Sequence, residues 1–419
     1  MRALLWALGG LWGCGGEATP EDVVGPLGIP LVVDGVVRAG AASVEMTPAL
    51  KEAFFDVDGN HEFWGCFDDP TGAGEDCAGE GFQDDDGDGW FDALFIGGFG
   101  YRRPALGVHD SIEARAVVLA QDGSYVAMVG LDLVGLGHRR IDQAAARLAE
   151  EGFDADRLVV ASTHNHQGPD TMGLWGDPLA GVSGYDPEYQ DVVVEAIVAA
   201  VKEAAAGMEA VTLTVGAQRM RDRGAWFNGS VFGGVNPTAK MHGMIHDIRD
   251  PVVVSDQVLA VQGKAADGST VFTFTSWSGH PEVRGGNNND LSADWVGVMR
   301  DVVEARLGGV VVHLPECLGG MQSALGGDVP LVEEDGTHVW QRCDEEAVAD
   351  AGDAECFGKA SGAVRTTAEG VELPVWAPKD SWAFVTSHGW HIAEAVLDVL
   401  AAGETVTSAP IREIGRAHV

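Results

Sequence analysis

Basic residues are scarce in this chain of 419 residues. It contains 26 Lys and Arg against 64 Asp and Glu, which gives a formal net charge of -38. Because so acidic a surface repels nucleic acids and anionic membrane faces, the composition excludes nucleic-acid binding as a function. Hydrophobic residues make up 46% of the chain and charged residues 21%, proportions that are ordinary for a globular protein and exclude wholesale disorder.

Long apolar runs are also lacking, since no segment reaches the ~18 apolar residues that a transmembrane helix requires. The chain begins MRALLWALGGLWGCGGEATPED, in which one arginine and a short apolar stretch precede Gly-Cys-Gly-Gly. This pattern predicts an export signal and linker over residues 1–30, with Cys14 as the lipidated first residue of a lipoprotein. In the alternative, simple secretion, Cys14 is lost with the signal peptide. We therefore expect an exported protein, either a cell-surface or outer-membrane lipoprotein or a secreted one.

Cysteine is limited to six residues. Export permits disulfides, and the spacing favours two local pairs, Cys66 with Cys77 and Cys343 with Cys356. Sequence alone does not fix the connectivity. Cys317 would then be an odd, buried thiol.

Strand and helix patterns alternate along the chain, which predicts an α/β protein with mixed β-sheets flanked by helices over residues 31–412. Two strands around an Asp-Gly turn fill 113–136, and an Ala-rich amphipathic helix and a buried strand follow, forming a βαβ unit. Parallel sheets carry their sites at the carboxyl ends of the strands. We expect the helices at 139–152, 187–206, 293–308 and 388–403, and further strands at 156–163, 210–218, 257–263, 270–280 and 309–315, with short strands and turns over 29–48.

Residues 51–110 are acidic, rich in glycine and poorly periodic, which indicates a large insertion or surface loop. Within it, QDDDGDGWFDAL has the spacing of a calcium loop, with oxygen ligands at alternate positions and a glycine for the sharp turn. Phe95 stands where an EF-hand has its glutamate. The segment FFDVDGNHEF is a weaker second copy, and a solvated acidic loop is the alternative for both. The expected ligands of a structural calcium ion are Asp84, Asp86, Asp88, Asp92 and the carbonyl of Trp90.

The last seven residues, EIGRAHV, match the translation of a common sequencing adapter. We expect residues 413–419 to be an assembly artefact and the natural protein to continue past about residue 412.

Two histidines follow a buried strand in the segment ASTHNHQGPD at residues 161–170, and a third, His280, ends the strand segment at 270–280. Neutral imidazole is a common zinc ligand, and catalytic zinc sites gather their ligands from several segments. His164, His166 and His280 therefore predict a zinc site at the strand ends. For His109, His242, His246, His388 and His391, ordinary structural roles are favoured.

A family resemblance rests on the same segments. VVASTHNHQGPDTMG resembles the Thr-His-x-His-Ser-Gly-Pro segment of the neutral/alkaline non-lysosomal ceramidases, zinc-dependent amidases that cleave N-acylsphingosines. TFTSWSGHPE with NNNDLSADW, and GGMQSALGGDV, are similar to later family segments, so that the resemblance covers roughly residues 110 to 330. It implies that His164 and His280 are zinc ligands. His166 would lie beside the metal, as a proton-transfer or substrate-orienting group.

Three further residues complete the expected site. Asp132 ends a neighbouring strand, where it would act as a base, hydrogen-bond a ligand histidine, or serve only as a turn carboxylate. Arg223 and Ser323 are the nearest equivalents of substrate-binding residues in two altered family segments. The family's remaining ligands, a Glu and a Tyr, have no counterpart before residue 412. These departures favour an acyl amide or ester other than ceramide.

We therefore expect an exported zinc hydrolase that cleaves the amide bond of an N-acyl lipid with metal-activated water. The alternatives are a zinc esterase or amidase with a non-ceramide substrate, and a non-catalytic, calcium-stabilised surface protein that uses the same fold for binding. The expected partners are a small-molecule or lipid amide and, through a lipid anchor, a membrane. No protein partner is indicated.

Overall fold

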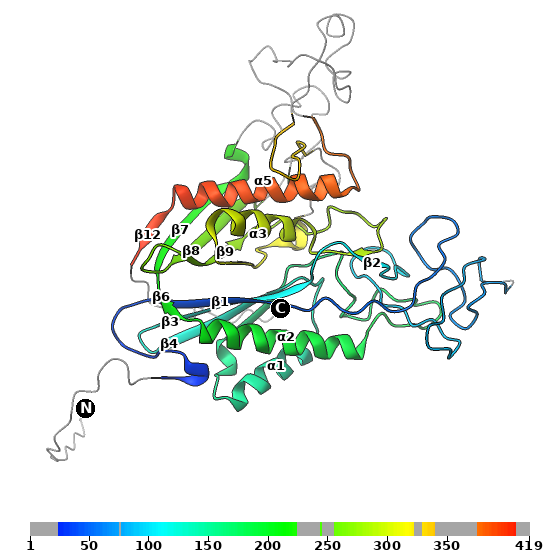
Figure 1. Cartoon of the computed structure of the whole chain (residues 1–419), viewed down its shortest axis with the longest axis horizontal. Coiled ribbons are helices and arrows are strands. Elements are labelled where there is room, and N and C mark those ends of the chain that lie inside the picture. The colour runs from blue at the N-terminus through cyan, green and yellow to red at the C-terminus, as the bar shows by residue number, and fades with distance from the viewer. Residues whose placement is uncertain are drawn as a thin grey trace, which may run out of the picture.

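Two β-sheets lie face to face between two pairs of helices, as Figure 1 shows. The computed structural model describes residues 24–74, 77–223, 244, 255–321, 329–339 and 375–407. Helices α1 and α2 cover one sheet, and α3 and α5 cover the other. The expected α/β class with helices flanking mixed sheets is confirmed.

The first sheet has the strand order β5-β4-β3-β1-β6. Strands β3 and β4 form the expected hairpin, and β5 returns parallel to β4 after α1, which confirms the βαβ unit. One continuous strand, β1, replaces the several short strands expected over 29–48. The elements of this half are β1 (Arg38–Glu45), β3 (Glu113–Gln121), β4 (Ser124–Leu131), α1 (His138–Glu150), β5 (Leu158–Ser162), α2 (Pro187–Ala206) and β6 (Glu209–Ala210), with short 3-10 turns at Pro26–Gly28 and Ala155–Arg157.

The second sheet has the order β11-β9-β8-β7-β12, and β11 returns parallel to β9 after α3. Helix α5 begins six residues earlier than the expected 388, because Ser381 caps it by accepting a hydrogen bond from the Phe384 N–H at 3.1 Å. The elements of this half are β7 (Thr212–Arg219), β8 (Gln257–Lys264), β9 (Thr270–Ser276), α3 (Asp294–Leu307), β11 (Val310–His313), α5 (Trp382–Ala401) and β12 (Glu404–Val406), with 3-10 turns at Met220–Arg223 and Leu318–Gly320.

Apolar side chains fill three layers of core. One cluster packs the first sheet against α1 and α2, a second packs the other sheet against α3 and α5, and a third lies between the sheets. The sheets approach closely where β4 meets β11, because a Cβ at Gly130 would lie 2.6 Å from the carbonyl oxygen of His313. This close approach holds the carboxyl ends of β4 and β11 together.

Residues 51–106 contain no long helix or strand, yet they are more than the surface loop expected from the sequence. Six buried phenylalanines form a separate core, and a disulfide joins Cys66 to Cys77 as predicted. Cys317 is free but exposed, so the prediction of a buried thiol is wrong, because it lies in the turn after β11 and not inside a sheet. Cys343 and Cys356 lie outside the described residues. The phenylalanines are Phe54, Phe63, Phe67, Phe82, Phe91 and Phe95.

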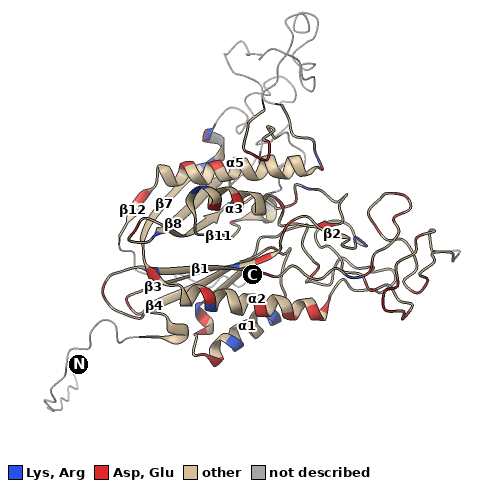
Figure 2. Cartoon of the chain, viewed as in Figure 1, with Lys and Arg blue, Asp and Glu red and all other residues tan. Residues whose placement is uncertain are grey.

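Acidic side chains recur along α2 and through the loops around the short β2 (Gly107–Val108), which pairs with β10 (Asp290–Leu291) (Figure 2). Within the described ranges, no helix is long and apolar enough to cross a membrane.

Candidate metal centre

Two strands, one from each sheet, deliver the three predicted histidines to one place. His164 and His166 follow the carboxyl end of β5, and His280 follows the carboxyl end of β9 in the other sheet. Their ring centroids lie 5.2 Å apart for His164 and His166, 4.9 Å for His164 and His280, and 5.7 Å for His166 and His280. One nitrogen from each ring lies within 4.8 Å of the others, close enough to hold one metal ion.

Backbone carbonyls orient two of the rings. The Nδ1 atom of His164 lies 2.7 Å from the carbonyl oxygen of Val134, and that of His280 lies 2.7 Å from the carbonyl oxygen of Met321. With Nδ1 donating to a carbonyl, each ring keeps Nε2 as a lone-pair donor, which is how histidine ligands are usually held in metal sites. Two ligands are therefore positioned by the main chain.

The turn that carries the histidines is strained and locked. His164 adopts a φ of 68°, a left-handed conformation that is rare outside glycine. Buried Asn165 secures the turn, because its side-chain amide donates to the carbonyl oxygens of Asp132, at 3.2 Å, and Ser292, at 2.6 Å. Its oxygen accepts the Gln167 N–H at 2.9 Å. This turn thereby ties β5 to the segment that precedes α3.

His166 is the least satisfied of the three. Both of its ring nitrogens are buried, and neither has a hydrogen-bond partner within the described part of the chain. Phe99 packs edge-on against its ring at 5.0 Å, and a Cβ at Gly98 would lie 2.4 Å from its Cγ, so only glycine fits there. The nearest carboxylate oxygen, Oε2 of buried Glu282, lies 3.6 Å from Nδ1.

Glu282 was not found from the sequence. It follows His280 by two residues, and the tight turn between them, in which the Glu282 N–H donates to the His280 carbonyl at 3.1 Å, brings it back to the cluster. The signal available in the sequence was the His-Pro-Glu order itself, which places a carboxylate at a ligand-bearing turn.

The cluster favours neutral imidazoles. Burial lowers the pKa of His164, and its neighbour His280 lowers it further. Burial, with the nearby His164, His280 and Arg103, lowers the pKa of His166 to about 3. Neutral imidazole is the form that binds a metal ion.

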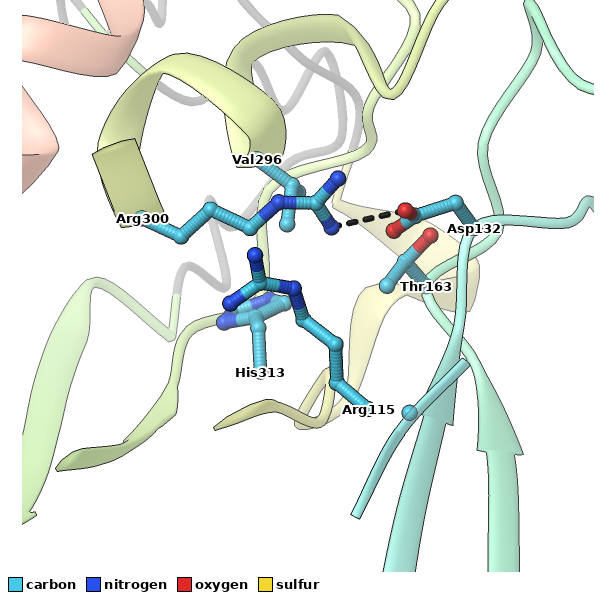
Figure 3. A pocket seen from close by; sticks show the side chains of 7 residues that line it. Arg115, Asp132, Thr163, Val296, Arg300 and His313 are labelled. Atoms are coloured by element: carbon cyan, nitrogen blue, oxygen red, sulfur yellow. Dashed lines mark hydrogen bonds and ion pairs between the residues drawn. The ribbon is translucent and has the colours of Figure 1, made fainter. Parts of the chain in front are cut away.

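Asp132 makes no hydrogen bond to His164, His166 or His280 among the described residues, so its expected role beside a ligand finds no support there. Its carboxylate accepts from Arg300 at 2.6 Å and from the Glu113 N–H at 2.9 Å, while a carbonyl takes the place expected for it beside His164. Figure 3 shows this pair at the edge of a small polar cavity between the sheets. Thr163 Oγ1 and His313 Nε2 are buried there without a hydrogen-bond partner among the described residues, which suits an ordered water.

The remaining predicted residues lie elsewhere. Arg223 pairs with Asp398 on α5 at 2.5 Å, so its charge is already matched and the substrate-binding role expected for it finds no support. Ser323, His242, His246 and Cys14 lie outside the described residues.

The acidic loop folds partly as expected. Asp84 and Asp86 are drawn together with Glu52, with ligand oxygens within 4.8 Å of one another, and Asp56 and Asp58 meet Glu80 in the same way. Asp88 accepts the Trp90 N–H at 2.7 Å, and the Asp92 N–H donates to Glu52 Oε2 at 3.0 Å. Neither glutamate was identified from the sequence, because each reaches its loop from a distant segment.

Residues 79–370 match the family described as neutral/alkaline non-lysosomal ceramidase, N-terminal. The chain belongs to this family. Among solved structures, a neutral ceramidase from Pseudomonas aeruginosa is similar in fold, with a TM-score of 0.54 and 15% identity over 90% of this chain and 46% of that one. A structure described as ceramidase complexed with C2 has a TM-score of 0.47 and 17% identity, over 70% of this chain and 39% of that one. No curated protein matches the sequence significantly.

This member of the ceramidase family spans less than half the length of the Pseudomonas aeruginosa structure, which it covers to 46%. At 15% identity, that likeness establishes the fold alone.

Proposed function

We propose that this chain is the catalytic portion of an exported, zinc-dependent hydrolase that cleaves the amide bond of an N-acyl lipid. The observation that carries the proposal is the convergence of His164, His166 and His280, whose ligand nitrogens lie within 4.8 Å of one another. Membership of the ceramidase family supports an amide as the bond that is cleaved.

The donor set fits zinc. Imidazole nitrogens suit zinc better than they suit calcium or magnesium, which prefer oxygen ligands. His164 and His280 would hold the ion through Nε2, because each Nδ1 is engaged with a carbonyl oxygen at 2.7 Å. Bound there, zinc would supply Lewis acidity, which lowers the pKa of a water and polarises an acyl carbonyl.

Residues of the chain would handle the proton. His166 has both ring nitrogens buried and free of hydrogen bonds within the described part of the chain, and its ring centroid lies 5.2 Å from that of His164 and 5.7 Å from that of His280. It is therefore the side chain best placed to take a proton and pass it to the leaving amine nitrogen. Glu282, 3.6 Å from its Nδ1, would orient the ring and stabilise its protonated form.

Apolar side chains near the cluster support an acyl chain as part of the substrate. Met172 packs against Gly135, one residue after the carbonyl that orients His164, and is exposed. Leu174, Leu179 and Tyr101 are also exposed, on the loops that Arg102 joins by pairing with Asp177 at 2.9 Å. Exposed apolar side chains on loops that are tied to one another in this way are suited to contact with an acyl chain.

Export and calcium binding belong to the same proposal. The disulfide between Cys66 and Cys77 supports an oxidising compartment, in agreement with the signal pattern that ends at Cys14. We propose calcium as a structural ion in the acidic loop, bound by Asp84 and Asp86 with Glu52, since carboxylate oxygens are its preferred ligands.

Metal analysis combined with an activity assay tests the proposed function. The purified chain is assayed for zinc and calcium, and then for the release of fatty acid from N-acylsphingosine, from simpler N-acyl amines and from the corresponding acyl esters. One zinc ion per chain together with amide turnover is the expected result. Calcium without zinc and without turnover would instead establish a non-catalytic surface protein, and turnover of acyl esters alone would establish an esterase.

A further inference from the structure

Arg103 is a buried cation whose hydrogen-bonding capacity is largely unused. Only 1% of its surface is exposed. Its Nη2 donates to Gln167 Oε1 at 3.0 Å and to the Asn288 carbonyl oxygen at 3.1 Å. Its Nε and Nη1 are buried without any partner among the described residues. Since a guanidinium has five N–H bonds, those on two of its three nitrogens are left without an acceptor.

No carboxylate balances this charge at close range. Within the described part of the chain, Arg103 makes no ion pair. The carboxylate of Glu62 acts on it only at longer range and accepts a hydrogen bond from Trp64 Nε1, at 3.0 Å, in place of one from the guanidinium. Burial lowers the pKa of Arg103 to about 10, so the side chain is still charged at neutral pH. A buried charge without a counter-ion is costly, and proteins keep such groups mainly where a ligand completes them.

A second arginine adds to the positive charge. Arg284 follows His280 by four residues. It carries the same positive charge as Arg103 and lowers the pKa of Arg103 by repulsion. Its Nε is also buried without a partner in the described ranges, while its Nη1 donates to the Asp380 carbonyl oxygen at 2.9 Å. The charge of Arg284 is partly offset by Asp290, Asp294 and Asp380, so Arg103 is the one of the two arginines that lacks a carboxylate at close range among the described residues.

The unused donors lie beside the histidine cluster. Gln167, which accepts from Arg103, directly follows His166. Phe99 lies between the two, with its ring centroid 5.0 Å from that of His166 and 5.5 Å from Arg103 Cζ. Phe99 is only partly buried, so this side of the histidine cluster is not fully closed to solvent.

We propose that Arg103, assisted by the charge of Arg284, binds an anionic head group on the amine half of the substrate. The preferred substrates are then N-acyl amides whose amine carries a carboxylate or a sulfonate, and not the neutral diol of a ceramide. The inference rests on the proposed amide hydrolysis at the histidine cluster. In this proposal, the oxygens of the head group accept the hydrogen bonds that Arg103 Nε and Nη1 leave unused. The histidines carry out the cleavage of the amide bond.

Three substrates with the same acyl chain separate charge from size. N-octanoylglycine and N-octanoyltaurine carry a carboxylate and a sulfonate, and N-octanoylethanolamine is the neutral analogue. For the unmodified protein, we expect kcat/KM to be at least about 10-fold higher for one or both anionic amides, because charge-assisted hydrogen bonds are stronger than neutral ones. The two anionic substrates show which oxyanion the site accepts.

Variants at Arg103 locate the effect. Arg103→Gln should lower kcat/KM for the preferred anionic amide by about 100-fold, mainly through KM, and that for the ethanolamide by less than about 3-fold. Arg103→Lys keeps the charge and should retain part of the preference. Arg157→Gln, which alters an arginine in the 3-10 turn before β5, is the matched control and should leave all three rates unchanged.

Equal rates for anionic and neutral amides in the unmodified protein would overturn the proposal, whether or not the variants fold. An equal loss on all three substrates in a folded Arg103→Gln would also overturn it, because that pattern indicates a purely structural arginine. If the unmodified protein hydrolyses none of these amides nor N-acylsphingosine, the proposed hydrolysis fails instead. Thermal stabilisation by N-octanoylglycine but not by N-octanoylethanolamine would then still support head-group binding, and its absence would contradict it.

Discussion

The imidazole rings of His164 and His280 lie 4.9 Å apart, although one follows a strand of the first sheet and the other a strand of the second. The contact exists because the two sheets pack face to face with the carboxyl ends of β5 and β9 at the same end of the molecule. Any metal bound by both rings therefore bridges the two halves of the fold. Such a metal would stabilise the packing of the sheets as well as take part in chemistry.

Removing either of these histidines should remove the metal. We expect His164→Ala and His280→Ala each to lose bound zinc and amide hydrolysis, because two ligands from opposite sheets are both needed to hold the ion. Zinc content by mass spectrometry and fatty-acid release check this. His138→Ala, an exposed histidine on α1, should change neither. Full zinc occupancy in His164→Ala would show that the ion is bound elsewhere.

A variant at His166 distinguishes metal binding from proton transfer. We expect His166→Ala to retain zinc while losing most of its kcat, typically about 100-fold or more for a lost proton-transfer group. The same measurement of zinc content and kcat decides the point. Loss of zinc in His166→Ala would instead make this histidine a third ligand, a role that its position in the cluster also allows.

Asp132 should matter for stability and not for metal binding. It forms an ion pair with Arg300 at 2.6 Å, and the side chains are only 3% and 5% exposed. Asp132→Ala leaves Arg300 with Glu113 as an ion-pair partner at 3.0 Å. The charge of Arg300 is then only partly compensated, so the free energy of unfolding should fall by about 3 kcal/mol, the lower end for breaking a buried pair. Urea denaturation measures this, with the exposed Asp142→Ala as the control. A folded Asp132→Ala of unchanged stability, but without zinc, would restore the role first expected of Asp132.

Much of the fold could be predicted because its signals are local. The βαβ unit, helix α2 at residues 187–206 and most strands follow from hydrophobic periodicity and turn residues, which act within a few positions. The histidine cluster could be predicted because functional sites of α/β sheets lie at the carboxyl ends of the strands, so side chains that follow different strands are expected to lie close together. His164, His166 and His280 each follow a strand directly or within a few residues.

The parts that could not be predicted depend on contacts between distant loops. Glu52 meets Asp84 and Arg103 meets Gln167 only after the loop at 51–106 has packed on its own phenylalanines. Asp132 sits at a strand end like the histidines, yet Arg300 on α3 takes its carboxylate. A strand-end position therefore brought the side chain to the correct edge of the sheet without determining which partner it would find.

Acid should destabilise the fold through buried histidines. His388 on α5 is fully buried among Trp277 and Trp295, neither ring nitrogen has a partner within the described residues, and burial lowers its pKa to about 3. The unfolded chain binds a proton near pH 6.5 and the folded one does not. Stability is therefore constant above about pH 6.5 and falls as the pH drops below it, by about 1.4 kcal/mol per pH unit for each such histidine.

A variant isolates the contribution of His388. His388→Phe removes the titrating group while keeping a ring among the tryptophans, so its free energy of unfolding should fall less steeply between pH 6.5 and pH 4.5. Urea denaturation across that range gives the slope. His313 and His391, whose pKa values are also lowered to about 3 and about 4, should maintain part of the slope. An unchanged slope in His388→Phe, with an exposed His138→Phe as comparison, would place the acid sensitivity elsewhere.

Calcium should stabilise the acidic loop through a glutamate from another segment. Glu52 is buried, and its two oxygens accept the Asp85 N–H at 2.7 Å and the Asp92 N–H at 3.0 Å, which holds its charge beside Asp84 and Asp86. Three carboxylates this close repel one another, and a bound calcium ion relieves that repulsion. Adding calcium to chelator-treated protein should therefore raise stability, by about 2.7 kcal/mol at 100 times the dissociation constant.

Glu52→Gln is the decisive variant because it keeps the size of the side chain while removing one charge. We expect it to be at least as stable as the unmodified protein without calcium, since repulsion among the carboxylates falls, and to gain much less when calcium is added. Thermal unfolding with and without calcium measures both effects, and Glu150→Gln on the exposed face of α1 is the control. An equal gain from calcium in both variants would mean that the ion binds without Glu52, and no gain in the unmodified protein would leave this loop a solvated acidic turn.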